Sequence, residues 1–127
     1  DETTRLKYLP TALRLFAVVF VVGVPALMHL WPDAWAWTPA QPEYEQMMMG
    51  MYVVLGIFLW RAARNPLEHR SLIWFTVWSS VVHGGIMLVQ ALRDEADRAN
   101  LIGDVPELFL VAIVLAWLMP RSGSQIR

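Results

Sequence analysis

The chain has 127 residues, of which 57% are hydrophobic and 17% are charged, and its formal net charge is −1. One small domain, residues 1–127, accounts for this length, but the composition is more apolar than a soluble domain needs. No basic patch is present, which argues against nucleic-acid binding. Because the chain lacks cysteine, it has no disulfide, thiolate metal site or iron–sulfur cluster.

The first apolar segment follows a polar lead-in and is long enough to cross a bilayer, so we predict a spanning helix over residues 11–31. Pro25 should bend this helix, because proline removes an intrahelical hydrogen bond. The chain begins at Asp1 rather than Met, so whether residues precede it stays open. The apolar run exceeds a signal-peptide core, and we expect a retained anchor.

A tryptophan-rich connection follows, with Trp31, Trp35 and Trp37. Such residues favour the membrane–water interface. The next apolar segment predicts a second spanning helix over residues 44–62. Methionines occupy positions 47 to 49 and 51, early in this segment. Neighbouring residues of a helix point in different directions, so at most two of these side chains could face one ion. We therefore interpret them as flexible packing rather than a copper(I) site.

The third segment has a marked start. Asn65, Pro66 and Glu68 match a helix cap, a first-turn proline and a capping-box acid. Residues 71–92 then carry no charge apart from any on His83, which predicts a spanning helix over residues 67–92. We expect the other segments to pack around this helix.

Polar side chains form one stripe on this third helix. His69, Thr76, His83 and Gln90 lie seven residues apart, and each such step drifts only about 20° around a helix. Polar groups in hydrocarbon need partners, so the stripe should face protein or a wet cavity. The glycines at 84 and 85 should admit another helix or a flat ligand. Our candidates for buried polar or ligand contacts are Met49, Tyr52, Ser79, Ser80, His83 and Gln90.

The fourth segment repeats the start signal with Asp104, Pro106 and Glu107 and ends at Pro120. Residues 104–120 reach the lower limit for a span. Short connections between four spans predict an all-α, integral-membrane four-helix bundle with antiparallel, up-down topology.

The basic residues indicate the orientation, because cytoplasmic flanks retain Lys and Arg. In a four-span arrangement only Arg93 and Arg98 fall on the outer side. The cytoplasmic set comprises Arg5, Lys7, Arg14, Arg61, Arg64, Arg70, Arg121 and Arg127. We therefore predict a multi-pass membrane protein with both termini in the cytoplasm.

One residue from each predicted span falls at a similar depth. Counting about 1.5 Å per residue from the basic flanks puts His29, Glu45, His83 and Glu107 roughly 20 to 24 Å from the inner edge. Two imidazoles and two carboxylates could bind a divalent metal or form an acid/base relay. Ordinary interfacial placement explains three of them, and a hydrogen bond to Ser, Tyr52 or Glu45 would satisfy His83.

Haem is a less favoured alternative. His69 and His83 lie fourteen residues apart on one face, or about 21 Å along the axis, a separation that resembles the paired haem ligands of b-type cytochromes. One chain supplies only half of the axial ligands from this helix, so a dimer would be needed. His69 is explained more simply as an interfacial residue.

Several stretches resemble an uncharacterised family of small bacterial four-helix membrane proteins, notably NPLEHRSLIWF, WSSVVHG and LIGDVPELFLVAIVLAW. The resemblance extends from Glu45 to the end of the fourth segment. It implies an inner-membrane protein with four spans, and it implies no activity and no residue role.

The leading functional hypothesis is a small membrane binding or accessory subunit that packs against another membrane complex, itself or a lipid-like ligand. The alternative is a membrane enzyme or metal- or cofactor-binding protein that uses the His/Glu cluster on a lipid or quinone. A transporter would need a polar path, which the inner half lacks unless the chain forms oligomers. No catalytic motif appears, so no catalytic residue is assigned.

Overall fold

The computed structural model describes residues 1–36 and 42–120, and all regular secondary structure within them is helical. In chain order the elements are α1 (Glu2–Val18), the π-helical turn η1 (Val19–Gly23), α2 (Val24–Leu30), α3 (Pro32–Trp35), α4 (Pro42–Ala62), the 3-10 helix η2 (Pro66–His69), α5 (Arg70–Arg93), the 3-10 helix η3 (Glu95–Ile102) and α6 (Asp104–Leu118). The predicted all-helical class is confirmed for these residues.

Two helices in the described part of the chain are long and apolar enough to cross a membrane, Glu2–Leu30 and Pro66–Arg93. A third candidate is the pair η3 and α6, which meet at a bend of 41°. The remaining long helix, α4, has Glu43, Glu45 and Gln46 in its first turns and Arg61 near its end, which shortens its apolar stretch. The helices thus indicate a membrane protein.

The outward surface of the long helices is also apolar. Soluble monomers rarely expose contiguous apolar patches this extensive, whereas lipid tails would cover them without cost. Examples of exposed large apolar side chains are Leu15, Val22, Met51, Phe58, Phe75, Val82, Val89, Ile113 and Trp117.

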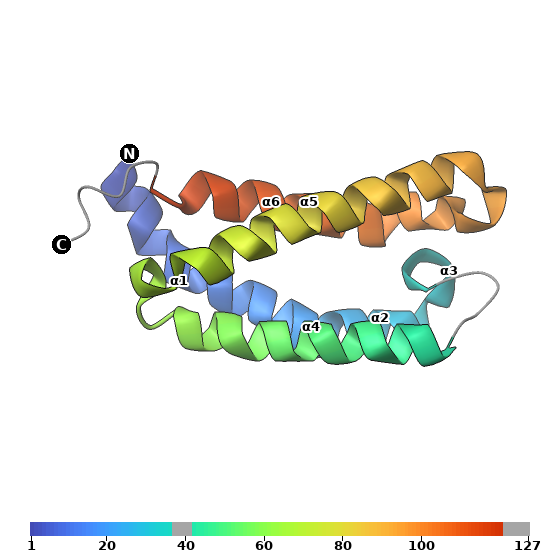
Figure 1. Cartoon of the computed structure of the whole chain (residues 1–127), viewed down its shortest axis with the longest axis horizontal. Coiled ribbons are helices and arrows are strands. Elements are labelled where there is room, and N and C mark those ends of the chain that lie inside the picture. Colours follow the sequence, from blue (N-terminus) through green and yellow to red (C-terminus); the bar gives the residue numbers. More distant parts are fainter. Residues whose placement is uncertain (37–41, 121–127) are drawn as a thin grey trace.

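The helices associate as two groups that share a core (Figure 1). α4 lies along α1 and η1, α5 packs against α6, and α1 contacts α6. Leu13, Leu59 and Ile73 are fully buried where these groups meet. By contrast, α4 and α5 make little contact with each other, so the side between them is less tightly packed.

Glycines allow α4 to pack closely against α1 and η1, and α5 to pack closely against α6. A Cβ at Gly56 would lie 2.6 Å from Cγ2 of Val21 and 2.9 Å from the carbonyl oxygen of Ala17. A Cβ at Gly84 would lie 3.3 Å from Cβ of Leu108. The predicted role of Gly84 in admitting a neighbour is therefore explained by α6 rather than by a ligand.

The helix starts differ from the sequence-based predictions. The supposed lead-in is already helical: α1 begins at Glu2, and the Asp1 carboxylate accepts a hydrogen bond of 2.8 Å from the Thr4 N–H. Asn65 makes no side-chain cap bond, because the chain passes through η2 before α5 begins. Asp104 is likewise not a cap, since Gly103 occupies that position.

Pro25 is accommodated by a local irregularity. The π-helical turn η1 immediately precedes α2, and Pro25 lies in the first turn of that helix. Because proline has no N–H to donate to the preceding turn, the wider hydrogen-bonding pattern re-pairs the backbone there. The structure thus has a π-helical turn beside Pro25 within the continuous helix Glu2–Leu30, and the predicted bend stays a prediction.

The tryptophans of the connection are not equivalent. Trp31 is exposed, whereas Trp35 is buried between α2 and η3 and belongs to a cluster with Val24 and Ala34. Trp37 lies outside the described residues. An interfacial belt therefore explains Trp31 but not Trp35.

We expect Gly56→Ala to destabilise the protein by about 1 to 3 kcal/mol, because the new methyl group would overpack the contact between α4 and α1. Gly50→Ala on the same helix is the matched control, since a Cβ there meets nothing within 4 Å. It should be neutral or slightly stabilising because alanine favours helix. Thermal unfolding in detergent micelles measures both; equal effects of the two substitutions would contradict the packing argument.

Candidate functional site

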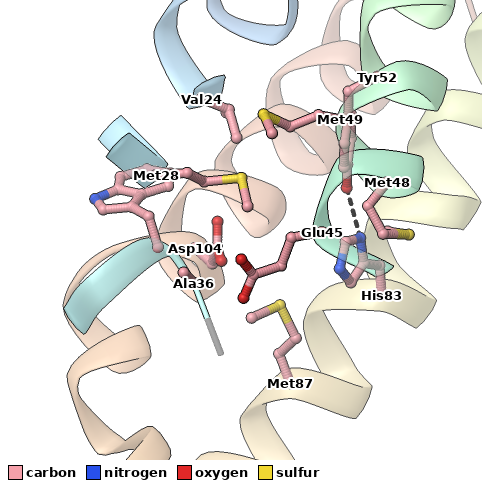
Figure 2. Close-up of a pocket in the computed structure, with 11 residues that line it drawn as sticks. Val24, Met28, Ala36, Glu45, Met48, Met49, Tyr52, His83, Met87 and Asp104 are labelled. Carbon is pink, nitrogen blue, oxygen red and sulfur yellow. Dashed lines mark hydrogen bonds between the residues drawn. The ribbon is translucent and has the colours of Figure 1, made fainter. Parts of the chain in front are cut away.

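A hydrogen bond between α4 and α5 forms the centre of the candidate site (Figure 2). The Tyr52 hydroxyl lies 2.5 Å from Nδ1 of His83, and the two rings are stacked with centroids 5.8 Å apart. The ring of Phe20 also lies against that of Tyr52, at 5.1 Å between centroids. This bond joins two helices that otherwise make little contact.

The direction of this hydrogen bond decides which imidazole nitrogen carries the proton. When the phenol O–H donates, Nδ1 accepts, and the neutral imidazole carries its proton on Nε2. Within the described residues no hydrogen-bond partner of Nε2 is present. His83 is therefore held in position by one nitrogen and can donate a hydrogen bond through the other.

A small cavity lies against this pair, and we call it the His83 cavity. Its volume of about 40 Å³ is enough for roughly three water molecules. Figure 2 shows the carboxylates of Glu45 and Asp104 pointing into it. The lining residues are Val24, Met28, Trp35, Ala36, Glu45, Met48, Met49, Tyr52, His83, Met87 and Asp104.

A third carboxyl group belongs to the same region. Glu107 lies one turn after Asp104 on α6 and is partly buried, with no hydrogen-bond partner for its buried Oε2 among the described residues. Glu45 on α4 and Asp104 on α6 thus line the His83 cavity together with the Tyr52–His83 pair, and Glu107 lies outside that lining.

The other face of the pair borders an apolar depression between α4 and α5, which we call the α4–α5 groove. Its part next to His83 has a volume of about 340 Å³ and is lined by Met48, Met51, Tyr52, Leu55, Phe75, Ser79, Ser80, Val82, His83 and Ile86. It continues into a part of about 700 Å³ lined by Met47, Gly50, Met51, Val54, Leu55, Phe58, Leu72 and Phe75.

Tyr52 and His83 line both spaces. The hydrogen-bonded pair therefore forms a wall with acidic groups and room for water on one side and an apolar groove on the other. Typical sites for small ligands have this composition, an apolar concavity with few polar groups, and a volume of roughly 300 to 1,000 Å³.

Four of the six predicted ligand-contact candidates line the groove: Tyr52, Ser79, Ser80 and His83. Met49 lines only the His83 cavity. Gln90 is exposed and belongs to neither lining. The polar stripe as a whole is thus not directed at one site.

The hydroxyl groups of Thr76 and Ser79 are satisfied locally. Thr76 is fully buried, and its hydroxyl donates to the Leu72 carbonyl at 2.9 Å. The Ser79 hydroxyl donates to the Thr76 carbonyl at 3.3 Å. Such bonds to the preceding turn satisfy a hydroxyl in hydrocarbon without any ligand.

The four predicted metal ligands are only partly brought together. Glu45 and His83 line the same cavity, Glu107 lies nearby outside its lining, and His29 is exposed at the end of α2. Across residues 1–36 and 42–120, no three His, Asp or Glu side chains gather as a metal site would require. Divalent-metal binding stays a prediction, as does haem, for which His69 is exposed.

Sequence reasoning missed Asp104 and the two methionines Met28 and Met87. The spacing of Asp104 and Glu107 could have indicated a shared face, but Asp104 was interpreted as a helix cap. Met28 and Met87 come from α2 and α5, and nothing in either segment predicts that these helices converge.

The comparisons with known proteins identify a family. The sequence profile of a family of unknown function, DUF6632, matches residues 3–126, so the chain belongs to that family. No curated protein and no solved structure matches the chain.

The Tyr52–His83 bond predicts energetic coupling between the two residues. In a double-mutant cycle with Tyr52→Phe and His83→Ala, we expect a coupling of about 0.5 to 1.7 kcal/mol, as for other hydrogen bonds between membrane helices. Tyr8→Phe is the control, because Tyr8 is exposed and lies on α1, outside the two helices that the bond joins. Reversible unfolding in mixed micelles measures the cycle, and additive effects would show that the bond contributes nothing to stability.

Proposed function

We propose that this protein, as a member of a family without an assigned activity, is a small bacterial inner-membrane protein that binds a lipid-like ligand in the α4–α5 groove. One observation carries the proposal: the apolar groove ends at a hydrogen-bonded Tyr52–His83 pair that retains a donor. Membrane lipids, a second copy or another membrane subunit would cover the remaining apolar surface.

The architecture we propose is a four-span, antiparallel bundle with both termini in the cytoplasm. The distribution of Lys and Arg supports this orientation, because Arg61, Arg64 and Arg70 flank the connection between α4 and α5. In this arrangement α4 and α6 are both spans with a short apolar stretch. The acidic first turn of α4 would lie at the outer interface, where Glu45 and Asp104 line the same cavity.

A ligand would enter this groove sideways from the bilayer. Met51, Phe75, Val82 and Ile86 line the groove, and each is at least half exposed. These side chains would face acyl chains in a membrane. Access therefore requires no opening of the helix packing, only replacement of a bound lipid tail.

The alternative function is a membrane enzyme or cofactor protein acting on a lipid or quinone. The specific observation in its favour is the proximity of Glu45 and Asp104 to the Tyr52–His83 pair. Phenol, imidazole and carboxylate are the groups used in general acid–base catalysis. Loss of turnover in correctly folded His83→Ala protein would support this alternative, whereas loss of ligand retention alone supports binding.

The topology can be tested by cysteine labelling, because the chain has no native cysteine. Treatment of intact cells with a membrane-impermeant maleimide should label Glu95→Cys. Thr3→Cys and Glu68→Cys should react only after permeabilisation. All three positions are exposed in the structure, so labelling of Glu68→Cys in intact cells would contradict the proposed orientation.

Ligand binding can be tested by filling the groove. Ser79→Phe should reduce the amount of small amphiphile that co-purifies with the protein, because the new ring occupies the space beside His83. Val89→Phe is the control on the same helix; Val89 is half exposed and outside the groove lining. Native mass spectrometry of protein ejected from nanodiscs measures retention. Equal retention by Ser79→Phe and wild type would contradict binding in this groove.

A further inference from the structure

We infer that the groove selects a neutral lipophile whose ring carries a hydrogen-bond-accepting oxygen, the chemistry of a quinone, with an alkyl or isoprenoid tail along α4 and α5. This inference rests on the proposed function and names the chemical class of its ligand.

Charge excludes the common anionic amphiphiles. The polar end of the groove offers the neutral groups of Tyr52, Ser79, Ser80 and His83 and no Lys or Arg. Behind the Tyr52–His83 wall lie Glu45 and Asp104. A fatty-acid carboxylate or a phosphate would therefore enter without a cationic partner and beside acidic groups, and its desolvation would be uncompensated.

Depth excludes a headgroup that must remain hydrated. His83 lies about 20 Å along the helix from Arg70 and about 15 Å from Arg93, at 1.5 Å per residue. These basic residues flank the apolar body of α5, so His83 is near its middle. A phospholipid headgroup stays at the interface, whereas the ring of an apolar molecule can reach this level.

The donor arrangement favours an accepting oxygen. With the Tyr52 O–H donating to Nδ1 of His83, the imidazole proton is on Nε2 and is available to a ligand. The Ser79 hydroxyl already donates to the Thr76 carbonyl. A carbonyl oxygen on the ligand would complete the hydrogen bonding of the imidazole, and a hydrocarbon ring would leave that N–H unpaired at a cost.

The walls of the groove suit a flat ring followed by a chain. Met48, Met51 and Phe75 surround the part next to His83, and thioethers and aromatic rings make favourable contacts with planar π systems. Beyond Leu55 the lining is wholly apolar as far as Phe58 and Leu72. A tail lying there would replace lipid on an exposed apolar surface.

The experiment compares three probes with the same ten-carbon tail: n-decylbenzoquinone, n-decylbenzene and decanoate. Isothermal titration calorimetry uses full-length protein in nanodiscs, with empty nanodiscs subtracted for partitioning. We expect the quinone to bind at least tenfold more tightly than decylbenzene, and decanoate to bind no better than decylbenzene.

Variants then assign the hydrogen bond. His83→Phe should weaken quinone binding about tenfold and leave decylbenzene unchanged, while His83→Gln, which keeps an N–H donor, should restore most of the affinity. His69→Phe is the matched control, because His69 belongs to the same predicted stripe as His83 but does not line the groove. It should leave the affinity for both neutral probes unchanged. Should His83→Phe fail to fold, Tyr52→Phe tests the same point, because it removes the group that holds the imidazole proton on Nε2.

The outcomes separate the two proposals. Equal binding of quinone and decylbenzene, tightest binding of decanoate, or loss of both neutral probes in His83→Phe would overturn the quinone assignment and leave a less selective lipid site. Absence of binding by all three probes would instead overturn the proposed groove function itself.

Discussion

The hydrogen bond from Tyr52 to His83 is the interaction on which the rest of the site depends. An imidazole near the middle of an apolar helix is costly unless its nitrogen atoms are paired. Tyr52 satisfies one of them, and it does so from a helix that barely contacts α5 otherwise. The same bond therefore anchors His83, connects α4 with α5 and separates an acidic cavity from an apolar groove.

The groove follows from where the small residues lie. Gly56 allows α4 to approach α1, and Gly84 allows α5 to approach α6. Each long helix thus uses its close-packing face on a partner other than the helix across the groove. The bulky side chains Met51, Leu55 and Phe75 remain between α4 and α5, where they line a depression instead of filling a core. The close packing of α4 on α1 and of α5 on α6 thus leaves space between α4 and α5.

Sequence patterns predicted the helices and the importance of His83, but not how the helices face one another. Periodicity placed Thr76 and Gln90 on one stripe with His83, yet Thr76 is buried and Gln90 is exposed. Counting residues gives depth along a helix and no rotation about it, so His29 has a comparable predicted depth but is exposed and outside the cavity lining. Asp104 was mispredicted in the opposite sense. Its position suggested a helix cap, so it was not considered for the site, yet it lines the cavity.

The composition of the His83 cavity bears on the metal hypothesis. Carboxylates suit hard cations and thioethers suit soft ones, and this cavity combines Glu45 and Asp104 with methionines. The imidazole that could serve either ion has Nδ1 occupied by Tyr52, so only Nε2 remains. That nitrogen serves one purpose at a time: deprotonated to bind a metal, or protonated to donate to an oxygen. A phenol O–H that donates to Nδ1 is compatible with the second use, because the proton of the neutral imidazole is then on Nε2.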